Sequence, residues 1–187
     1  PTAVRIVLDG RDVTGEPAWR MTRFGIGRSF QRTDIFPTLS VLENVRLAVQ
    51  AVTPVRNPFR RADSEASLLD RAHDALQRMG LREVTAREAG ALSHGEQRQL
   101  EIAMALAGNA KVLLLDEPLA GMGPDESQRM ATVLRTLARE HAVLLIEHDM
   151  DIVFAVADRM TVMAEGCVLA QGTPEAIRAN AAVQSAY

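Results

Sequence analysis

The sequence predicts an α/β fold with a mainly parallel sheet and a mostly helical middle region, from about residue 38 to 92. Two unbroken apolar runs, Val112–Leu115 and Ala142–Ile146, are typical of strands that are buried on both faces. Helical patterns precede, separate and follow these runs. This alternation is the one expected when parallel strands are joined by helices that pack on the sheet.

Composition sets the limits of this fold. The chain has 187 residues, of which 47% are apolar and 24% charged, so a sizeable core can form without a disulfide or a structural metal. Cys167 is the single cysteine, which fits a reducing compartment. A net charge of −3 and an aromatic content of 4% argue against a nucleic-acid binder.

In the first half of the chain, short sequence signals mark where the predicted strands, helices and loops begin and end. The segment Arg5–Gly10 predicts a strand that ends in a turn, and Ser29–Asp34 predicts a polar connection. Ser40 stands three residues before Glu43, which is capping-box spacing and predicts the start of a helix. The proline-containing stretch Val52–Arg61 predicts a loop.

Start and stop signals are more regular in the second half. A helix with apolar residues at helical spacing ends at Gly80, a favourable stop. Ser93 and Glu96 form a second capping-box pair, and Pro124 opens the helix after the first buried strand. The other predicted elements are a helix at Asp149–Asp158, two short strands joined by a turn at Ala164–Gly166, and a final helix after Thr173.

Two adjacent carboxylates, Asp116 and Glu117, end the first buried strand. Ligands of α/β sheets bind at the carboxyl ends of the strands, and adjacent strand residues point in opposite directions. One carboxylate can therefore hold Mg²⁺, usually through water, while the other orients or deprotonates an attacking water. The alternative is that both residues cap the following helix, and the pair alone does not decide between them.

The segment Ser93-His94-Gly95-Glu96 stands at the start of a predicted helix. Free N–H groups and the helix dipole make such a start an anion site, and glycine lets a ligand approach the backbone closely. The alternative is an ordinary N-cap, which Ser93 and Glu96 would satisfy by themselves. Taken alone, the segment favours the ordinary N-cap.

Two further polar residues could act on a phosphate. His148 follows the second buried strand and could donate a hydrogen bond to a phosphate oxygen. Gln31 lies in the polar connection and could orient water or contact a metal. Singly, a histidine after a strand is more often structural, and a loop glutamine is most often a solvated residue.

The order of these motifs is more specific than any one of them. Over the whole chain it resembles the ATP-binding subunit of ATP-binding-cassette (ABC) transporters, and most of all the type found in branched-chain amino-acid importers. The resemblance implies a P-loop NTPase (RecA-like) core with an inserted α-helical subdomain. It assigns 1–31 to the core up to the Q-loop, 32–100 to the helical signature subdomain, and 101–187 to the rest of the core.

The resemblance also implies a role for each motif. Asp116 matches the aspartate that coordinates Mg²⁺, together with Gln31 of the Q-loop. Glu117 matches the catalytic glutamate, and His148 the switch histidine. The signature loop, which contacts the ATP held by a second subunit, corresponds to Ser93, His94, Gly95 and Glu96. The implied cofactors are ATP and Mg²⁺.

The partners implied are a second ATP-binding subunit, in a homodimer or heterodimer, and transmembrane permease subunits that place a cytoplasmic helix on the helical region. A solute-binding protein would act indirectly, and no nucleic acid is expected. The location would be the cytoplasmic face of the bacterial inner membrane. Alternatives are the ATPase of a urea or lipopolysaccharide transporter, a soluble ABC ATPase of DNA repair or translation, and a non-catalytic interaction module.

The sequence departs from the family pattern in three places. It has no Gly-x-x-x-x-Gly-Lys-Ser/Thr motif, because the single lysine, Lys111, follows Ala110. We therefore expect that the chain is part of a longer protein, that it hydrolyses no ATP alone, and that apolar strand edges and faces are open. His94 and Glu96 replace the usual glycine and glutamine, and Gly123 replaces the aspartate that usually ends the D-loop.

Overall fold

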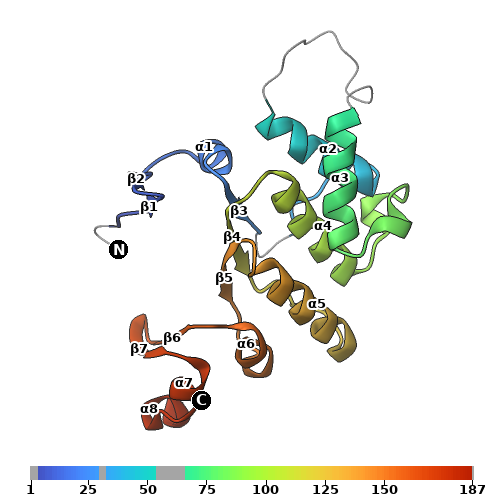
Figure 1. Cartoon of the computed structure of the whole chain (residues 1–187). Coiled ribbons are helices and arrows are strands. Elements are labelled where there is room, and N and C mark those ends of the chain that lie inside the picture. Colours follow the sequence, from blue (N-terminus) through green and yellow to red (C-terminus); the bar gives the residue numbers. More distant parts are fainter. Residues whose placement is uncertain (1–3, 30–32, 54–65, 187) are drawn as a thin grey trace.

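A parallel sheet with strand order β3-β4-β5 occupies the centre of this computed structural model (Figure 1). The strands are β3 (Ile26–Arg28), β4 (Val112–Asp116) and β5 (Ala142–Ile146). The structure describes residues 4–29, 33–53 and 66–186. The two predicted parallel strands are confirmed, with Leu113 of β4 paired to Val143 of β5.

Strand β3 is an element that the sequence did not predict, because it has only three residues and contains Gly27. The glycine allows helix α4 (His94–Ala107) to pack closely on the strand. A Cβ placed on Gly27 would lie 2.9 Å from the Cβ of Ala105 and 3.0 Å from the Cβ of Ala110. Such contacts are too short for carbon atoms, so β3 requires a glycine at this position.

Replacing Gly27 by alanine is therefore expected to lower the free energy of unfolding by about 1–3 kcal/mol, because overpacking forces the neighbours to shift. Chemical denaturation measures this change. Gly123→Ala is the control, since a Cβ there meets nothing within 4 Å. Equal stabilities of the two variants would show that the β3–α4 contact does not limit packing.

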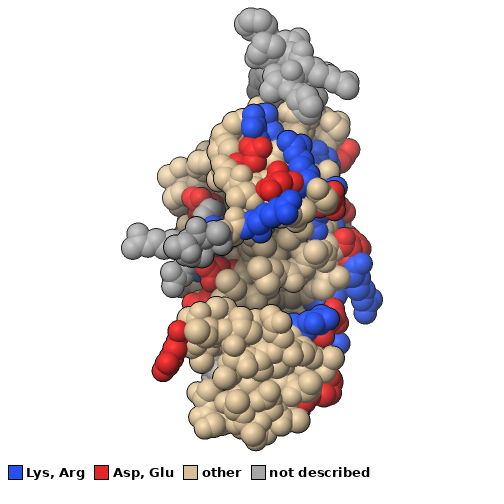
Figure 2. Space-filling model, turned by 90° about the vertical axis from the view of Figure 1, so that its left-hand side faces the viewer, with Lys and Arg blue, Asp and Glu red and all other residues tan. Residues whose placement is uncertain are grey.

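The expected burial of the strands on both faces is wrong. In β4, Leu113 and Leu115 are inaccessible, whereas the alternate positions are half-buried. In β5, Leu144 and Ile146 expose 58% and 57% of their surface. The physical reason is that the described helices cover one face of the sheet only. The expectation of an open apolar face is thus met at β5. Figure 2 shows a separate broad area without Lys, Arg, Asp or Glu at the lower end of the molecule, where the carboxyl-terminal elements lie.

The middle region is helical, as predicted, and lies to one side of the sheet (Figure 1). Helices α2 (Val41–Val52), α3 (Ala66–Arg78) and α4 share one core. Two short 3₁₀ helices, η2 (Arg82–Val84) and η3 (Ala89–Ala91), connect α3 to α4. The predicted loop at Val52–Arg61 lies almost wholly outside the described residues.

The predicted helix boundaries of this region are confirmed. The hydroxyl of Ser40 accepts the N–H of Glu43 at 3.1 Å and caps α2. The carboxylate of Glu43 binds Arg46. Gly80 adopts a φ of 74°, and the next N–H, from Leu81, donates to the carbonyl of Leu76 at 2.8 Å. This left-handed glycine closes α3 as the sequence indicated.

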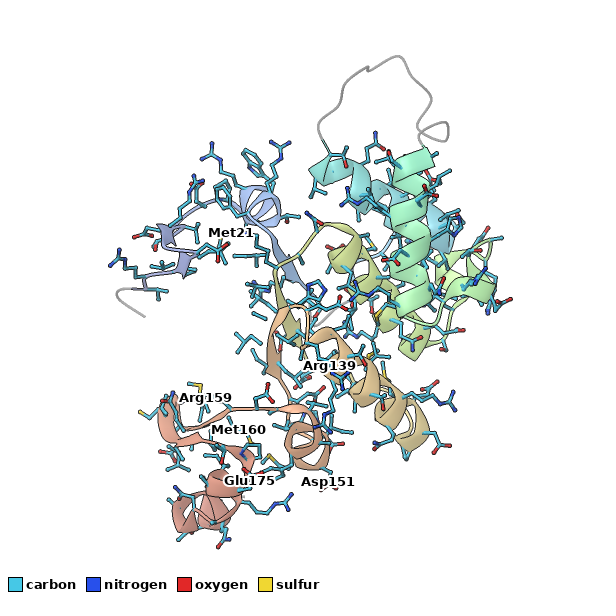
Figure 3. All side chains as sticks on the ribbon, viewed as in Figure 1. Met21, Arg139, Asp151, Arg159, Met160 and Glu175 are labelled. Atoms are coloured by element: carbon cyan, nitrogen blue, oxygen red, sulfur yellow. The ribbon has the colours of Figure 1, made fainter. Side chains whose placement is uncertain are left out.

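The second half completes the core and adds a smaller unit. Its predicted turn between two short strands is confirmed at Glu165 and Gly166, whose φ values of 49° and 77° are those of a type I′ hairpin. A small second core contains Met160 and Ile177 (Figure 3). The elements are α5 (Pro124–Leu137), α6 (Met150–Val156), β6 (Met160–Ala164), β7 (Cys167–Gly172), α7 (Pro174–Arg178) and α8 (Ala181–Ala186).

The amino-terminal elements form a small extension next to β3 (Figure 1). They are β1 (Val7–Leu8), β2 (Arg11–Asp12) and α1 (Ala18–Arg23), of which only the first strand was predicted. The two strands pair antiparallel. The division of the chain at residues 31 and 100 stays a prediction, and residue 100 lies within α4.

Candidate functional site

The register of β4 and β5 brings the two carboxylates next to the histidine. Asp116 ends β4 and pairs with Ile146, which ends β5. The N–H of Glu117 donates to the carbonyl of Ile146 at 2.9 Å. As a result, Nδ1 of His148 lies 3.4 Å from Oε1 of Glu117. The structure therefore places Asp116, Glu117 and His148 at one edge of the sheet.

Glu117 has a strained backbone. Its φ of 46° lies in the left-handed region, which costs a residue other than glycine about 1–2 kcal/mol. Such strain is often found at functional positions. The side chain is 34% exposed, while that of His148 is 77% exposed. His148 is therefore not a buried structural histidine, and both side chains can reach a ligand.

The idea that Asp116 and Glu117 cap the following helix is wrong. That helix, α5, begins at Pro124 and its N-cap is Gly123. The N–H of Gly123 donates to Oε2 of Glu126 at 3.3 Å. The turn between β4 and α5 therefore leaves both carboxylates at the strand end.

Glu147 organises this edge, although the sequence reasoning gave it no role. Its side chain is 2% exposed, and its two oxygens accept the N–H of Leu119 at 3.1 Å and the N–H of His148 at 3.2 Å. It thus links the turn after β4 to the turn after β5. The sequence offered one signal, a glutamate directly before His148. A carboxylate that is buried there needs hydrogen-bond donors, which backbone N–H groups supply.

Ser29 organises the other side of Asp116. It is buried at the end of β3, where its N–H donates to the carbonyl of Leu114 at 2.9 Å. Its hydroxyl accepts the N–H of Asp116 at 3.2 Å. Gln31, the predicted partner of Asp116, lies outside the described residues.

The fit of this edge to Mg²⁺ depends on Asp116. Within the described ranges, no group of three or more His, Cys, Asp or Glu side chains could hold a metal by itself. The Asp116 carboxylate forms no hydrogen bond or ion pair with a described residue. One available carboxylate suits Mg²⁺, which keeps several waters and binds phosphate oxygens together with one or two protein carboxylates.

The signature segment forms the first turn of α4. The hydroxyl of Ser93 accepts the N–H of Glu96 at 3.2 Å, and Glu96 accepts the N–H of Ser93 at 2.8 Å. The predicted capping box is therefore complete, and the following residue, His94, is exposed. Gly95 is buried, and a Cβ on it would lie 3.3 Å from Oε2 of Glu126.

The capping box and the anion site are compatible, because a cap leaves other N–H groups of the first turn free for a ligand. Sequence reasoning gave Glu126 no role, although its carboxylate on α5 lies close to Gly95 of α4. Among the described residues, no hydrogen bond or ion pair connects the signature segment or Glu126 to Asp116, Glu117 or His148.

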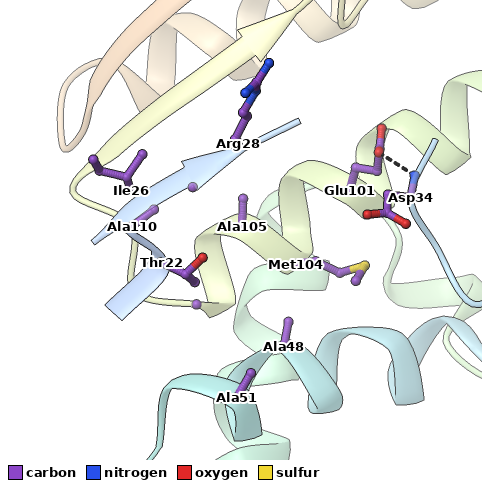
Figure 4. Close-up of a pocket in the computed structure, with 12 residues that line it drawn as sticks. Thr22, Ile26, Arg28, Asp34, Ala48, Ala51, Glu101, Met104, Ala105 and Ala110 are labelled. Atoms are coloured by element: carbon purple, nitrogen blue, oxygen red, sulfur yellow. Dashed lines mark hydrogen bonds between the residues drawn. The ribbon is translucent and has the colours of Figure 1, made fainter. Parts of the chain in front are cut away.

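A separate pocket of about 190 Å³ lies between β3, α2 and α4 (Figure 4). Arg28, Asp34 and Glu101 supply its polar lining, and small or apolar side chains supply most of the rest. Oε1 of Glu101 accepts the N–H of Asp34 at 2.7 Å. Burial raises the pKa of Glu101 above its ordinary value, although the Asp34 N–H and Arg98 favour the charged form.

This pKa shift predicts a pH dependence of stability. Because folding favours the protonated form of Glu101, its contribution to stability is full below pH 4.5 and is lost as the pH rises through the folded pKa. Glu101→Gln removes that loss. The free energy of unfolding of the variant, relative to the parent, should therefore become more favourable from acid towards neutral pH. Urea denaturation at several pH values measures this difference, and a constant difference would contradict the shift.

The comparisons with known proteins decide the family. The family model for ABC transporters matches residues 1–120. The chain belongs to the ABC transporter family. A second model, for the branched-chain amino acid ATP-binding cassette transporter, matches residues 167–187. The predicted family is thus confirmed, and the chain contains the ATPase domain of that family.

Three relatives of this ABC protein are named as branched-chain amino acid transport ATP-binding proteins. The high-affinity branched-chain amino acid transport ATP-binding protein LivG of Salmonella typhimurium is 40% identical over 100% of the chain and 76% of the relative. LivG of Escherichia coli K12 gives the same values. BraF of Pseudomonas aeruginosa, of the same description, is 38% identical with the same coverage.

Solved ABC cassettes share the fold. The ADP conformation of MJ1267, an ATP-binding cassette of an ABC transporter, has a TM-score of 0.79 and 27% identity, and covers 97% of this chain and 75% of that one. CbiO1 of Clostridium perfringens, part of an ABC transporter complex, also has a TM-score of 0.79 and 27% identity, with 100% and 72% coverage. The predicted P-loop NTPase class is confirmed. In the part of the ABC chain that is described, no helix has the length and apolar character to span a bilayer.

Proposed function

We propose that this chain belongs to the ATP-hydrolysing subunit of an ABC importer that takes up branched-chain or other amino acids. The observation that carries the catalytic proposal is the approach of His148 to Glu117, 3.4 Å apart beside Asp116, at the edge where α/β sheets bind ligands. The names of the LivG and BraF relatives, which align over the whole chain, support the transported class.

In the proposed reaction, each residue of the edge acts on the terminal phosphate of ATP. Glu117 orients the attacking water and accepts its proton, while His148 donates a hydrogen bond to a γ-phosphate oxygen. Asp116, together with Gln31, would hold Mg²⁺. The metal, when bound, neutralises charge that develops on the phosphate oxygens.

Glu147 has a supporting role in this proposal. Its buried carboxylate holds the backbone at Leu119 and at His148, so the two turns that carry the reacting side chains keep one spacing. Catalysis of phosphoryl transfer consists mainly of positioning and charge stabilisation, so this spacing matters more than any single contact.

The signature segment is proposed to complete the site of a second ATP-binding subunit. Its residues are Ser93, His94, Gly95 and Glu96. The N–H groups of the first turn of α4 and the helix dipole can bind a phosphate. The Ser93 hydroxyl, which accepts from Glu96, can still donate its own proton. The partner would be another copy of the chain or a related subunit.

The pocket between β3, α2 and α4 is proposed to receive a cytoplasmic helix of the transmembrane permease. Ala48, Ala51 and Met104 give it an apolar side that suits a partner helix. This arrangement would hold the ATPase at the cytoplasmic face of a bacterial inner membrane, and a solute-binding protein would act through the permease. No nucleic-acid partner is part of the proposal.

Reconstitution tests this function. The complete ATP-binding subunit is placed in vesicles with its permease and solute-binding protein, and ATP hydrolysis is measured with leucine, isoleucine, valine or urea. We expect the three amino acids, and not urea, to stimulate hydrolysis. Stimulation by urea alone, or by none of the four, would contradict the proposed substrate class.

A further inference from the structure

A buried carboxylate joins α4 to the segment that follows β3. Oε1 of Glu101 accepts the N–H of Asp34 at 2.7 Å, and Oε2 accepts a hydrogen bond from Arg98 at 2.8 Å. The side chains of Glu101 and Arg98 are only 5% and 9% exposed. Burying a charged pair costs free energy that a well-packed apolar pair would avoid. The pair therefore calls for an explanation other than stability.

The place of the Asp34–Glu101 hydrogen bond along the chain suggests an explanation for the buried pair. On the amino-terminal side of Gln31, Ser29 is held by Leu114 and Asp116 of β4. On the carboxyl-terminal side, Asp34 is held by Glu101 of α4. Ser29 and Asp34, which lie on either side of Gln31, are thus anchored to different elements. Ser29 is anchored to β4, which ends at Asp116, and Asp34 to α4, which begins at the signature segment.

The residues that form this hydrogen bond also line the pocket. Asp34 and Glu101 line it together with Ala48 and Ala51 of α2, and Figure 4 shows the hydrogen bond at one side of the lining residues. An occupant of the pocket would therefore lie next to Asp34 and Glu101. Binding of this occupant could therefore change the position of the Asp34 backbone directly, without a rearrangement in the core of the helical region.

We propose that Glu101 is a positioning residue, which acts through Asp34 to make ATP hydrolysis depend on the occupant of this pocket. The proposal rests on the proposed function, in which that occupant is a permease helix. The charged groups that face Glu101 are Arg98 on its own helix and Asp34 on the packed segment. The role of Glu101 is to accept the Asp34 N–H, and the role of Arg98 is to hold the carboxylate in place.

Two variants separate this role from simple packing. Glu101→Gln keeps a carbonyl oxygen that can accept the Asp34 N–H, whereas Glu101→Leu is of similar size and has no acceptor. Arg71→Leu is the control. It removes another hydrogen bond to α4, from Arg71 to the carbonyl of Ala107 at 2.7 Å, at a place away from Asp34.

The first measurement is hydrogen exchange of the Asp34 amide, which needs no assumption about function. Glu101→Leu should speed this exchange by about tenfold, because the amide loses its acceptor. Glu101→Gln and Arg71→Leu should leave the rate close to that of the parent. An unchanged rate in Glu101→Leu would overturn the proposal at its structural step.

The second measurement is ATP turnover of the complete subunit with its permease in vesicles. In Glu101→Leu the permease-stimulated kcat should fall by about tenfold, while KM for ATP changes by less than about twofold. Glu101→Gln should recover most of the stimulation, and Arg71→Leu should behave as the parent. Full stimulation in Glu101→Leu, or equal loss in Glu101→Gln, would overturn the proposal. If the parent itself is not stimulated, the proposed function fails, and the exchange result still decides whether the bond exists.

Discussion

Glu117→Gln is expected to lower ATP turnover of the complete subunit by about 10²–10⁴-fold while ATP binding is retained, because an amide cannot accept the proton of the attacking water. The substitution preserves size, so the neighbouring turn that Glu147 holds should stay in place. Steady-state kinetics and equilibrium ATP binding measure the two effects separately.

The matched control for this variant is Glu165→Gln. Glu165 lies in the exposed turn between β6 and β7, and it shares with Glu117 a positive φ, 49° against 46°. The control should hydrolyse ATP as the parent does. If the two variants have equal turnover, Glu117 is not the base.

Gly95→Asp is the second large expected loss. A side chain on Gly95 would start 3.3 Å from a carboxylate oxygen of Glu126, so an aspartate places like charges in contact at the first turn of α4. The added negative charge also repels phosphate from the proposed anion site. We expect a loss of about 10²–10³-fold in turnover, comparable to removal of a preorganised donor.

The loss expected for Gly95→Asp should affect ATP turnover and not the binding of ATP to the same subunit. Because the signature segment is proposed to serve the ATP of a second subunit, the affinity of a single Gly95→Asp subunit for ATP should not change. Calorimetry on the isolated complete subunit measures that affinity. The control is Gly123→Asp, where a Cβ meets nothing within 4 Å and the residue is the N-cap of α5. If Gly95→Asp lowers the affinity for ATP and Gly123→Asp does not, the proposal that the signature segment binds the ATP of the second subunit is contradicted.

Local signals predicted much of the fold and of the site. The capping box at Ser93 and Glu96 depends only on residues three apart, and it is complete in the structure. The strand β5 has the predicted bounds, and the predicted turn between two strands lies at Glu165 and Gly166. Glu117 and His148 were predicted to follow two buried strands, and they lie close together because parallel strands present their carboxyl ends at one edge.

Features that depend on tertiary neighbours could not be predicted in the same way. The exposure of Leu144 depends on what covers the sheet, which an apolar run does not reveal. Strand β3 is defined by the close packing of Gly27 on α4, and a lone glycine signals only a turn. Glutamates are usually exposed, yet Glu101 accepts a hydrogen bond from the distant Asp34, and Glu126 lies close to the distant Gly95.

The most direct test of the catalytic proposal is a structure of the complete subunit carrying Glu117→Gln, bound to ATP and Mg²⁺. The proposed function predicts that the γ-phosphate lies at the carboxyl ends of β4 and β5, within hydrogen-bond distance of His148, with Mg²⁺ next to Asp116. It also predicts Ser93 of a second subunit on the opposite side of the phosphate. A γ-phosphate bound away from His148 and Asp116 would contradict the proposal.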